Sequence, residues 1–273
     1  MRLNKEKKIG SIHTRNSLVM AAMTRSRAGE GAVPTDLMKT YYEQRSSAGL
    51  IITEATNISE DAFGSPFTPG IYTAAHIASW KKITDAVHQK GGKIVAQLWH
   101  TGRVAHSIDR KGVLPVAPSA IAIENASHYT SEGPKPYETP KELTLKEIDQ
   151  IISDYKQAAI NALDAGFDGV ELHAANGYLP LQFFSDSANK RTDKYGGSIE
   201  NKARFILDVL KILIETVGAD KVGIKLSPLQ PYGDIFFDDP VASYKYLINE
   251  INKMDIAFVE YMKRNFMGPE LPH

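Results

Sequence analysis

The chain has 273 residues, of which 42% are hydrophobic, with 32 basic and 32 acidic side chains and no cysteine. Because the charges balance, the chain has no net positive charge to bind a nucleic acid backbone, and we expect no nucleic acid partner. The lack of cysteine excludes a disulfide scaffold, a thiolate zinc site and a cysteine nucleophile. A charged N-terminal segment and the lack of a long apolar stretch predict a cytoplasmic protein that does not cross a membrane.

Short, nearly continuous apolar runs predict strands that are buried on both faces, as in a parallel sheet. In chain order these runs are residues 18–23, 50–56, 93–99, 169–175, 222–228 and 257–262. We therefore expect six strands.

The segments between these runs have a helical period. Residues 76–90 predict one helix, which Gly91 and Gly92 end. A capping box at Thr144–Glu147 begins a second helix, and Ser198 caps a third. The repeated strand–helix order predicts an α/β fold that is either a doubly wound open sheet or a (β/α)-barrel.

One stretch, at about residues 104–142, interrupts the alternation of predicted strands and helices, because it is rich in proline, serine and turn residues. An insertion of this length without a helical or strand pattern is more often a functional lid than a plain connector. No composition shift marks a second domain boundary. We therefore expect a single domain over residues 1–273 with a lid at about 104–142.

Polar residues follow or end the predicted strands, and in a barrel they would meet at one rim. They are Thr24, Glu54, Thr56, Gln97, Trp99, His100, His173, Asn176, Lys225 and Ser227. His100, His106 and His173 lack carboxylate or histidine partners at metal-ligand spacing, so no metal site is expected. No glycine-rich phosphate loop follows a strand, which disfavours a Rossmann dinucleotide site and an NTPase.

Five ordered segments resemble the signatures of the old yellow enzyme family. They are MAAMTRSRA at 20–28, YYEQRSSAGLIITEAT at 41–56, QLWHTGR at 97–103, HAANGY at 173–178 and RTDKYGGSIEN at 191–201. The resemblance implies a TIM (β/α)8-barrel that holds FMN. It also implies an ene-reductase that uses NADPH or NADH to reduce the C=C bond of α,β-unsaturated carbonyls and related activated alkenes.

The resemblance also implies a role for each matching residue. The flavin would contact Ala22, Met23, Thr24, Ala55, Gln97 and Lys225. The substrate would contact Trp99, His173, Asn176 and Tyr178. His173 and Asn176 would hold the substrate carbonyl and stabilise enolate charge, and Tyr178 would donate the proton.

Three features depart from the family pattern. Ala22 stands where the family usually has proline, and Lys225 stands where it usually has arginine, so the charge remains but the planar fork is lost. The third is that βα units seven and eight, which usually carry the phosphate loops, are missing, so we expect an incomplete barrel of about six units. The resulting open sheet edges favour a homodimer that covers them. The alternative function is a truncated, non-catalytic remnant with weak or no FMN binding.

Overall fold

The computed structural model describes residues 2–124 and 126–262. Its helices are α1 Asp36–Glu43, α2 Ala74–Gln89, α3 Leu145–Asp164, α4 Leu179–Phe184, α5 Ile199–Val217 and α6 Pro240–Ile251. Its strands are β1 Lys7–Ile9, β2 Ile12–Thr14, β3 Val19–Met20, β4 Leu50–Ile52, β5 Thr56–Asn57, β6 Ile94–Trp99, β7 Val116–Ala117, β8 Ser127–Thr130, β9 Gly133–Pro136, β10 Lys141–Glu142, β11 Gly169–Ala174, β12 Val222–Leu226 and β13 Phe258–Tyr261. Short 3-10 turns lie at Arg2–Asn4, Glu30–Ala32, Glu60–Ala62, Ser107–Arg110 and Ala219–Lys221.

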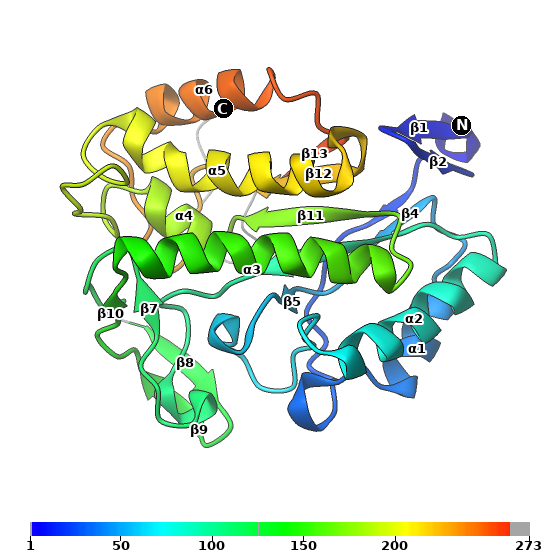
Figure 1. Ribbon diagram of the computed structural model, residues 1–273, viewed down its shortest axis with the longest axis horizontal. Coiled ribbons are helices and arrows are strands. Elements are labelled where there is room, and N and C mark those ends of the chain that lie inside the picture. Colours follow the sequence, from blue (N-terminus) through cyan, green and yellow to red (C-terminus); the bar gives the residue numbers. More distant parts are fainter. Residues whose placement is uncertain (1, 125, 263–273) are drawn as a thin grey trace.

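All six predicted apolar runs contribute to one parallel sheet in the order β13-β12-β11-β6-β4-β3 (Figure 1). The predicted strand at 50–56 is divided, because Thr53 Oγ1 accepts a hydrogen bond from Gln97 N–H (3.0 Å) in place of a regular ladder bond. Its second part, β5, pairs separately with β6. The run at 18–23 pairs only at β3, so its last residues are free to form a loop.

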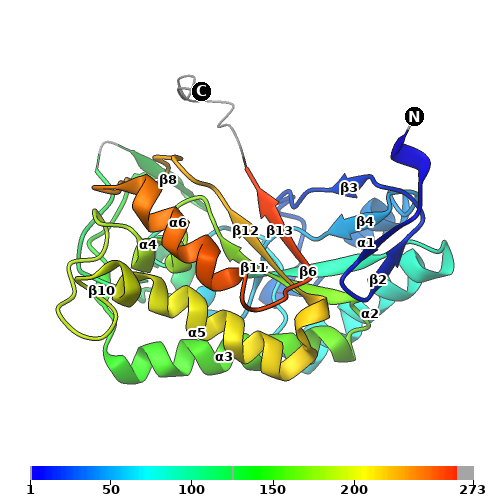
Figure 2. The ribbon, with the colours of Figure 1, turned by 90° about the horizontal axis from the view of Figure 1, so that it is seen from above.

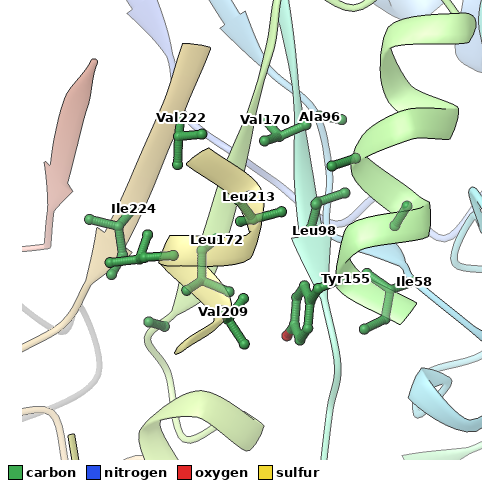
Figure 3. Close-up of a cluster of buried hydrophobic side chains, with 14 of the residues drawn as sticks. Ile58, Ala96, Leu98, Tyr155, Val170, Leu172, Val209, Leu213, Val222 and Ile224 are labelled. Atoms are coloured by element: carbon green, nitrogen blue, oxygen red, sulfur yellow. The ribbon is translucent and has the colours of Figure 1, made fainter. Parts of the chain in front are cut away.

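Helices α3, α5 and α6 lie side by side along one face of the curved sheet (Figure 2). Alternate strand residues face these helices, because side chains in a strand point to opposite faces in turn. This core includes Leu98, Leu172 and Ile224 from the sheet and Leu213 from α5, all fully buried (Figure 3). The fold is therefore an α/β half-barrel with helices outside.

The predicted helix starts are confirmed by their caps. Thr144 Oγ1 accepts from Glu147 N–H (3.3 Å), and Glu147 Oε2 accepts from Thr144 N–H (2.9 Å), so both halves of the capping box form at α3. At α5, the Ser198 side chain accepts from Asn201 N–H (3.3 Å). Helix α2 begins at Ala74, two residues before the predicted start, because Thr73 is its cap.

The N-terminal hairpin of β1 and β2 packs against the amino ends of the sheet strands. Ile12 packs against Leu50 and Val95, which lie at the amino ends of β4 and β6. Partly buried Phe258, at the start of β13, packs against the same cluster. This apolar layer closes the end of the sheet opposite to the one where polar residues gather.

The segment at 104–142 carries β7, β10 and the β8–β9 hairpin. Buried Arg103 ties this segment to the loop after β12, because its guanidinium donates to Ile121 O (2.9 Å) and Gly233 O (2.8 Å). In addition, His128 Nε2 lies 2.5 Å from Gly64 O. The segment is thus anchored to two loops at the carboxyl ends of the strands, and its role as a lid stays a prediction.

Within residues 2–124 and 126–262, β3 and β13 each pair with one strand only. Beside β13 lies an apolar surface whose most exposed side chains include Val241 and Tyr261 (75% and 57%). That a second copy of the chain covers this edge stays a prediction. No helix in the described part of the chain is long and apolar enough to span a bilayer.

Candidate active site

The predicted site residues of β6, β11 and β12 lie on the inner face of the half-barrel. Gln97, His173 and Lys225 alternate along their strands with the apolar residues that face the helices. The strand register sets His173 beside Lys225 and Gln97 beside Glu171. The structure therefore brings these three predicted residues to the same interior.

A tight turn after β11 carries two further predicted residues. Asn176 and Gly177 both have left-handed backbone angles (φ 54° and 75°). Asn tolerates this region, whereas Gly177 is required, since a Cβ there would meet Tyr232 O at 2.5 Å. Asn176 N–H donates to Ser227 Oγ (2.8 Å), which fixes the turn to the end of β12. Tyr178 then directly precedes α4.

The turn brings the Tyr178 ring back over the strand ends. Its ring centroid lies 4.8 Å from that of His173 and 5.0 Å from that of Trp99, edge-on in both cases. A cavity of about 220 Å³ adjoins Asn176 and Tyr178 and is also lined by Tyr232. The four residues predicted to contact substrate therefore come from neighbouring elements of one site, while their individual roles stay predictions.

Burial sets the protonation states of the two acid–base side chains. Burial, together with the positive charge of Lys225, lowers the pKa of His173 well below its ordinary value, so the imidazole is neutral near pH 7. Its Nδ1 atom is buried without a hydrogen-bond partner in the described part of the chain. Burial, with the nearby phenols of Tyr232 and Tyr137, raises the pKa of Tyr178, which keeps its hydroxyl protonated.

The predicted flavin contacts fall into two groups. Gln97 and Ala55 are buried, and Lys225 forms an ion pair with Glu260 (Nζ to Oε1, 2.8 Å). Ala22, Met23 and Thr24 instead lie in the loop after β3, where Met23 is 44% exposed. These three share the carboxyl edge of the sheet with the first group, but in the described residues no hydrogen bond joins the two groups.

The loop that carries Thr24 is held in place by the end of β4. Arg25 N–H donates to Glu54 Oε2 (3.1 Å), and the Tyr42 hydroxyl donates to Glu54 Oε1 (3.2 Å). Glu54 is buried, and its sequence position at a strand end suggested a site residue. Its contacts show that it positions a loop.

These residues fit a flavin. The interior offers an amide at Gln97 and a cation at Lys225, with the small Ala55 between β4 and β5. Buried Trp99 Nε1 and His173 Nδ1 lack partners within the described residues, and buried polar groups normally have one. Polar groups that converge on a pocket and lack a hydrogen-bond partner within the protein are typical of a ligand site.

Sequence reasoning missed Gln182, which organises the site from α4. Its amide donates to Gly177 O (2.7 Å) and Thr101 O (3.0 Å), and its Oε1 accepts from Arg103 N–H (3.1 Å). It is fully buried in the otherwise apolar run LPLQFF. A lone amide in such a run was the available signal, because buried amides are expected to be hydrogen-bonded.

A cavity of about 650 Å³ lies apart from these residues, between the loops at 29–32, 60–72 and 109–113. None of the predicted site residues lines it. We therefore place the site by its chemistry and not by cavity size. In the part of the chain that the structure describes, no cluster of three or more histidine or acidic side chains could hold a metal ion.

Together, a parallel half-barrel and an inner face with amide, imidazole and ammonium groups, next to a phenol over the strand ends, are the features expected of a flavin oxidoreductase. The NADH:flavin oxidoreductase / NADH oxidase family matches residues 5–266, and the chain belongs to this family. The name of the family contains both NADH and flavin, which confirms the predicted flavin cofactor and nicotinamide reductant.

Two relatives illustrate the similarity. A probable flavin mononucleotide-dependent alkene reductase of Leishmania infantum is 43% identical over 96% of this chain, which spans 73% of that protein. The 12-oxophytodienoate reductase 1 of Oryza sativa subsp. japonica is 45% identical over 90% of this chain. The chain spans 64% of the length of that relative.

The fold agrees with a solved structure of an old yellow enzyme homologue from Zymomonas mobilis. The two superpose with a TM-score of 0.92 at 42% identity. The match covers 96% of this chain and 73% of the other. The resemblance to the old yellow enzyme family is therefore confirmed in both sequence and fold.

Proposed function

We propose that this chain binds FMN at the carboxyl edge of its sheet and uses NADPH or NADH to reduce the C=C bond of α,β-unsaturated carbonyls and related activated alkenes. The observation that carries the proposal is the approach of the Tyr178 ring to that of His173 (4.8 Å), with Asn176 in the turn between them. Family membership and the flavin-dependent alkene reductase among the relatives support it.

With FMN bound, the cofactor's contribution would be hydride transfer from the nicotinamide to the β-carbon of the alkene. His173 and Asn176 donate hydrogen bonds to the carbonyl oxygen of the substrate. Because His173 is neutral, it acts as a hydrogen-bond donor and stabilises enolate charge without giving up its proton. Tyr178, held protonated by burial, delivers its hydroxyl proton to the α-carbon.

The part of the half-barrel interior that is lined by Gln97, Lys225 and Ala55 would hold the flavin ring. Gln97 would hydrogen-bond its pyrimidine edge, with Lys225 close by, and Ala55 leaves the ring room to approach the sheet. Thr24 and its neighbours Ala22 and Met23 would cover the ring from the loop after β3. The exposure of Met23 supports this assignment, because a bound ring would remove the side chain from water.

The proposal extends to the architecture. The six strands correspond to the first six βα units of a (β/α)8-barrel, and residues 1–273 form one domain in which the 104–142 segment lies over the active face. The parallel strand order and the anchoring of that segment by Arg103 support this assignment.

Reconstitution with FMN tests the proposal. The purified protein should hold FMN in a one-to-one ratio, and a phenol added to it should produce a long-wavelength charge-transfer band as it stacks on the flavin. A colourless protein that excess FMN cannot reconstitute would contradict the proposed function and would favour the non-catalytic alternative.

A further inference from the structure

A row of polar side chains crosses the inner face of the sheet. It runs from Gln97 on β6 through Glu171 on β11 and Lys225 on β12 to Glu260 on β13. Gln97 Nε2 donates to Glu171 Oε1 (2.7 Å), and Lys225 Nζ donates to Glu260 Oε1 (2.8 Å). The first three side chains are buried, and that of Glu260 is 21% exposed.

The row holds two carboxyl groups and one cation. Glu171 Oε2 and Glu260 Oε2 are both buried without a hydrogen-bond partner in the described part of the chain. Two ionised carboxylates only accept hydrogen bonds, so neither can satisfy the other. A buried carboxylate oxygen that lacks a donor is costly, and Lys225 can neutralise only one of the two charges.

A single proton between the two carboxyl groups supplies the missing hydrogen-bond donor and neutralises the second negative charge. Burial raises the pKa of Glu171 well above its ordinary value, and the charge of Glu260 raises it further. Glu171 is therefore the group that holds the proton, on the oxygen that Gln97 does not contact. Its hydroxyl then donates to Glu260, the ion-pair partner of Lys225.

We infer that Glu171 and Glu260 hold one proton between them and so form a neutral unit with Lys225 that fixes the amide of Gln97. Both glutamates are positioning residues for the flavin pocket, and this part of the inference rests on the proposed function. Because the Gln97 amide nitrogen donates to Glu171, the amide orientation is fixed, and its carbonyl oxygen points away from Glu171.

The neutral row has a consequence for redox chemistry. A free ammonium group near the ring would favour reduced flavin, which carries more negative charge. Glu260 cancels most of this effect. The row thus keeps reduced flavin a stronger hydride donor than an unpaired Lys225 would allow.

Infrared spectroscopy tests the shared proton without requiring bound flavin. At neutral pH, the wild-type protein should show the C=O stretching band of a protonated carboxyl group. Glu171→Gln and Glu260→Gln should each remove the band, because each leaves one carboxylate for one lysine. Glu250→Gln, in an exposed pair with Lys253, is the matched control and should leave it unchanged.

Lys225→Gln gives an independent test should a glutamate variant fail to fold. Without the cation, a second carboxyl group should take up a proton, and the band should grow. A wild-type protein without the band, a band that persists in Glu171→Gln, or no growth in Lys225→Gln would overturn the shared proton.

The midpoint potential of bound FMN tests the neutral charge. Each single glutamate variant should stay close to wild type, because the remaining carboxylate compensates Lys225. The double variant Glu171→Gln/Glu260→Gln should bind reduced FMN about tenfold tighter relative to oxidised FMN, a positive shift of about 30 mV for two electrons. An unchanged potential in the double variant, or an equal shift in a single variant, would overturn the charge balance. Failure to bind FMN would contradict the proposed function and leave the infrared test valid.

Discussion

The ring of Tyr178 stands edge-on to that of His173, with centroids 4.8 Å apart and planes inclined by 79°. The first residue directly precedes α4 and the second lies in β11, and the left-handed turn between them makes the approach possible. In the proposed site, a carbonyl bound by His173 would therefore lie next to the phenol of Tyr178, which burial keeps protonated. Under this proposal, substrate anchoring and proton delivery both depend on one local turn.

We expect Tyr178→Phe to slow alkene reduction by about 10²- to 10⁴-fold, since it removes the proton donor but keeps the ring. Flavin reduction by NADPH should stay near the wild-type rate, because that step needs no proton from Tyr178. Stopped-flow measurement of the two half-reactions separates these effects. Tyr129→Phe, at a tyrosine that is 73% exposed, is the control. Equal slowing of both half-reactions would argue against the assigned role.

The double variant His173→Ala/Asn176→Ala should weaken phenol binding. Each lost hydrogen bond to a charged ligand oxygen costs about 1.5–3 kcal/mol, so the phenol dissociation constant should rise at least about tenfold. Titration of the charge-transfer band measures it. His13→Ala, at an exposed histidine of β2, should leave the affinity unchanged. An unchanged affinity in the double variant would refute the substrate anchor.

Gln182→Leu should destabilise the fold, because it leaves Gly177 O, Thr101 O and Arg103 N–H without their buried partner. Unsatisfied buried groups of this kind cost about 1–3 kcal/mol each. Urea unfolding followed by circular dichroism gives the free energy of unfolding. The matched control is Gln150→Leu at an exposed position of α3. Equal stability of the two variants would show that Gln182 does not organise the loops.

Asp168 should make stability depend on pH. Burial alone would raise its pKa, but hydrogen bonds from His88, Lys93 Nζ and Ile94 N–H, each 2.8 Å long, lower the pKa below its ordinary value. The folded state therefore binds this proton more weakly than the unfolded state. The contribution of Asp168 is fully present above the unfolded pKa of about 3.9 and is lost as the pH falls through the folded value.

Asp168→Asn should accordingly lower the free energy of unfolding at pH 7 by about 1–3 kcal/mol. The difference from wild type should shrink as the pH falls below about 4. Urea titrations at several pH values measure both. A difference that grows toward acid pH would contradict the assigned contacts.

Much of the fold followed from local patterns in the sequence. Apolar runs gave the strands, and the capping box at Thr144–Glu147 gave the start of α3. The break in the second strand could not be predicted, because it depends on the bond from Gln97 N–H to Thr53 Oγ1, between residues 44 positions apart. Helix α4 was also missed, since six buried residues show no helical period of exposed and apolar positions.

The candidate site followed largely from motif resemblance, which singled out His173, Asn176 and Tyr178. Resemblance could not show that Lys225 is paired. Its partner Glu260 lies 35 residues away on the next strand, and only the register of β12 and β13 brings them together. Charge balance inside a sheet is therefore a tertiary property that linear spacing does not reveal.

Reoxidation of the reduced flavin by an alkene tests the central claim most directly. FMN-loaded protein, reduced anaerobically with NADPH, should recover its oxidised absorbance on addition of an enone, with one saturated product formed per flavin. A flavin that stays reduced in the presence of excess enone would contradict the assignment of this chain as an ene-reductase.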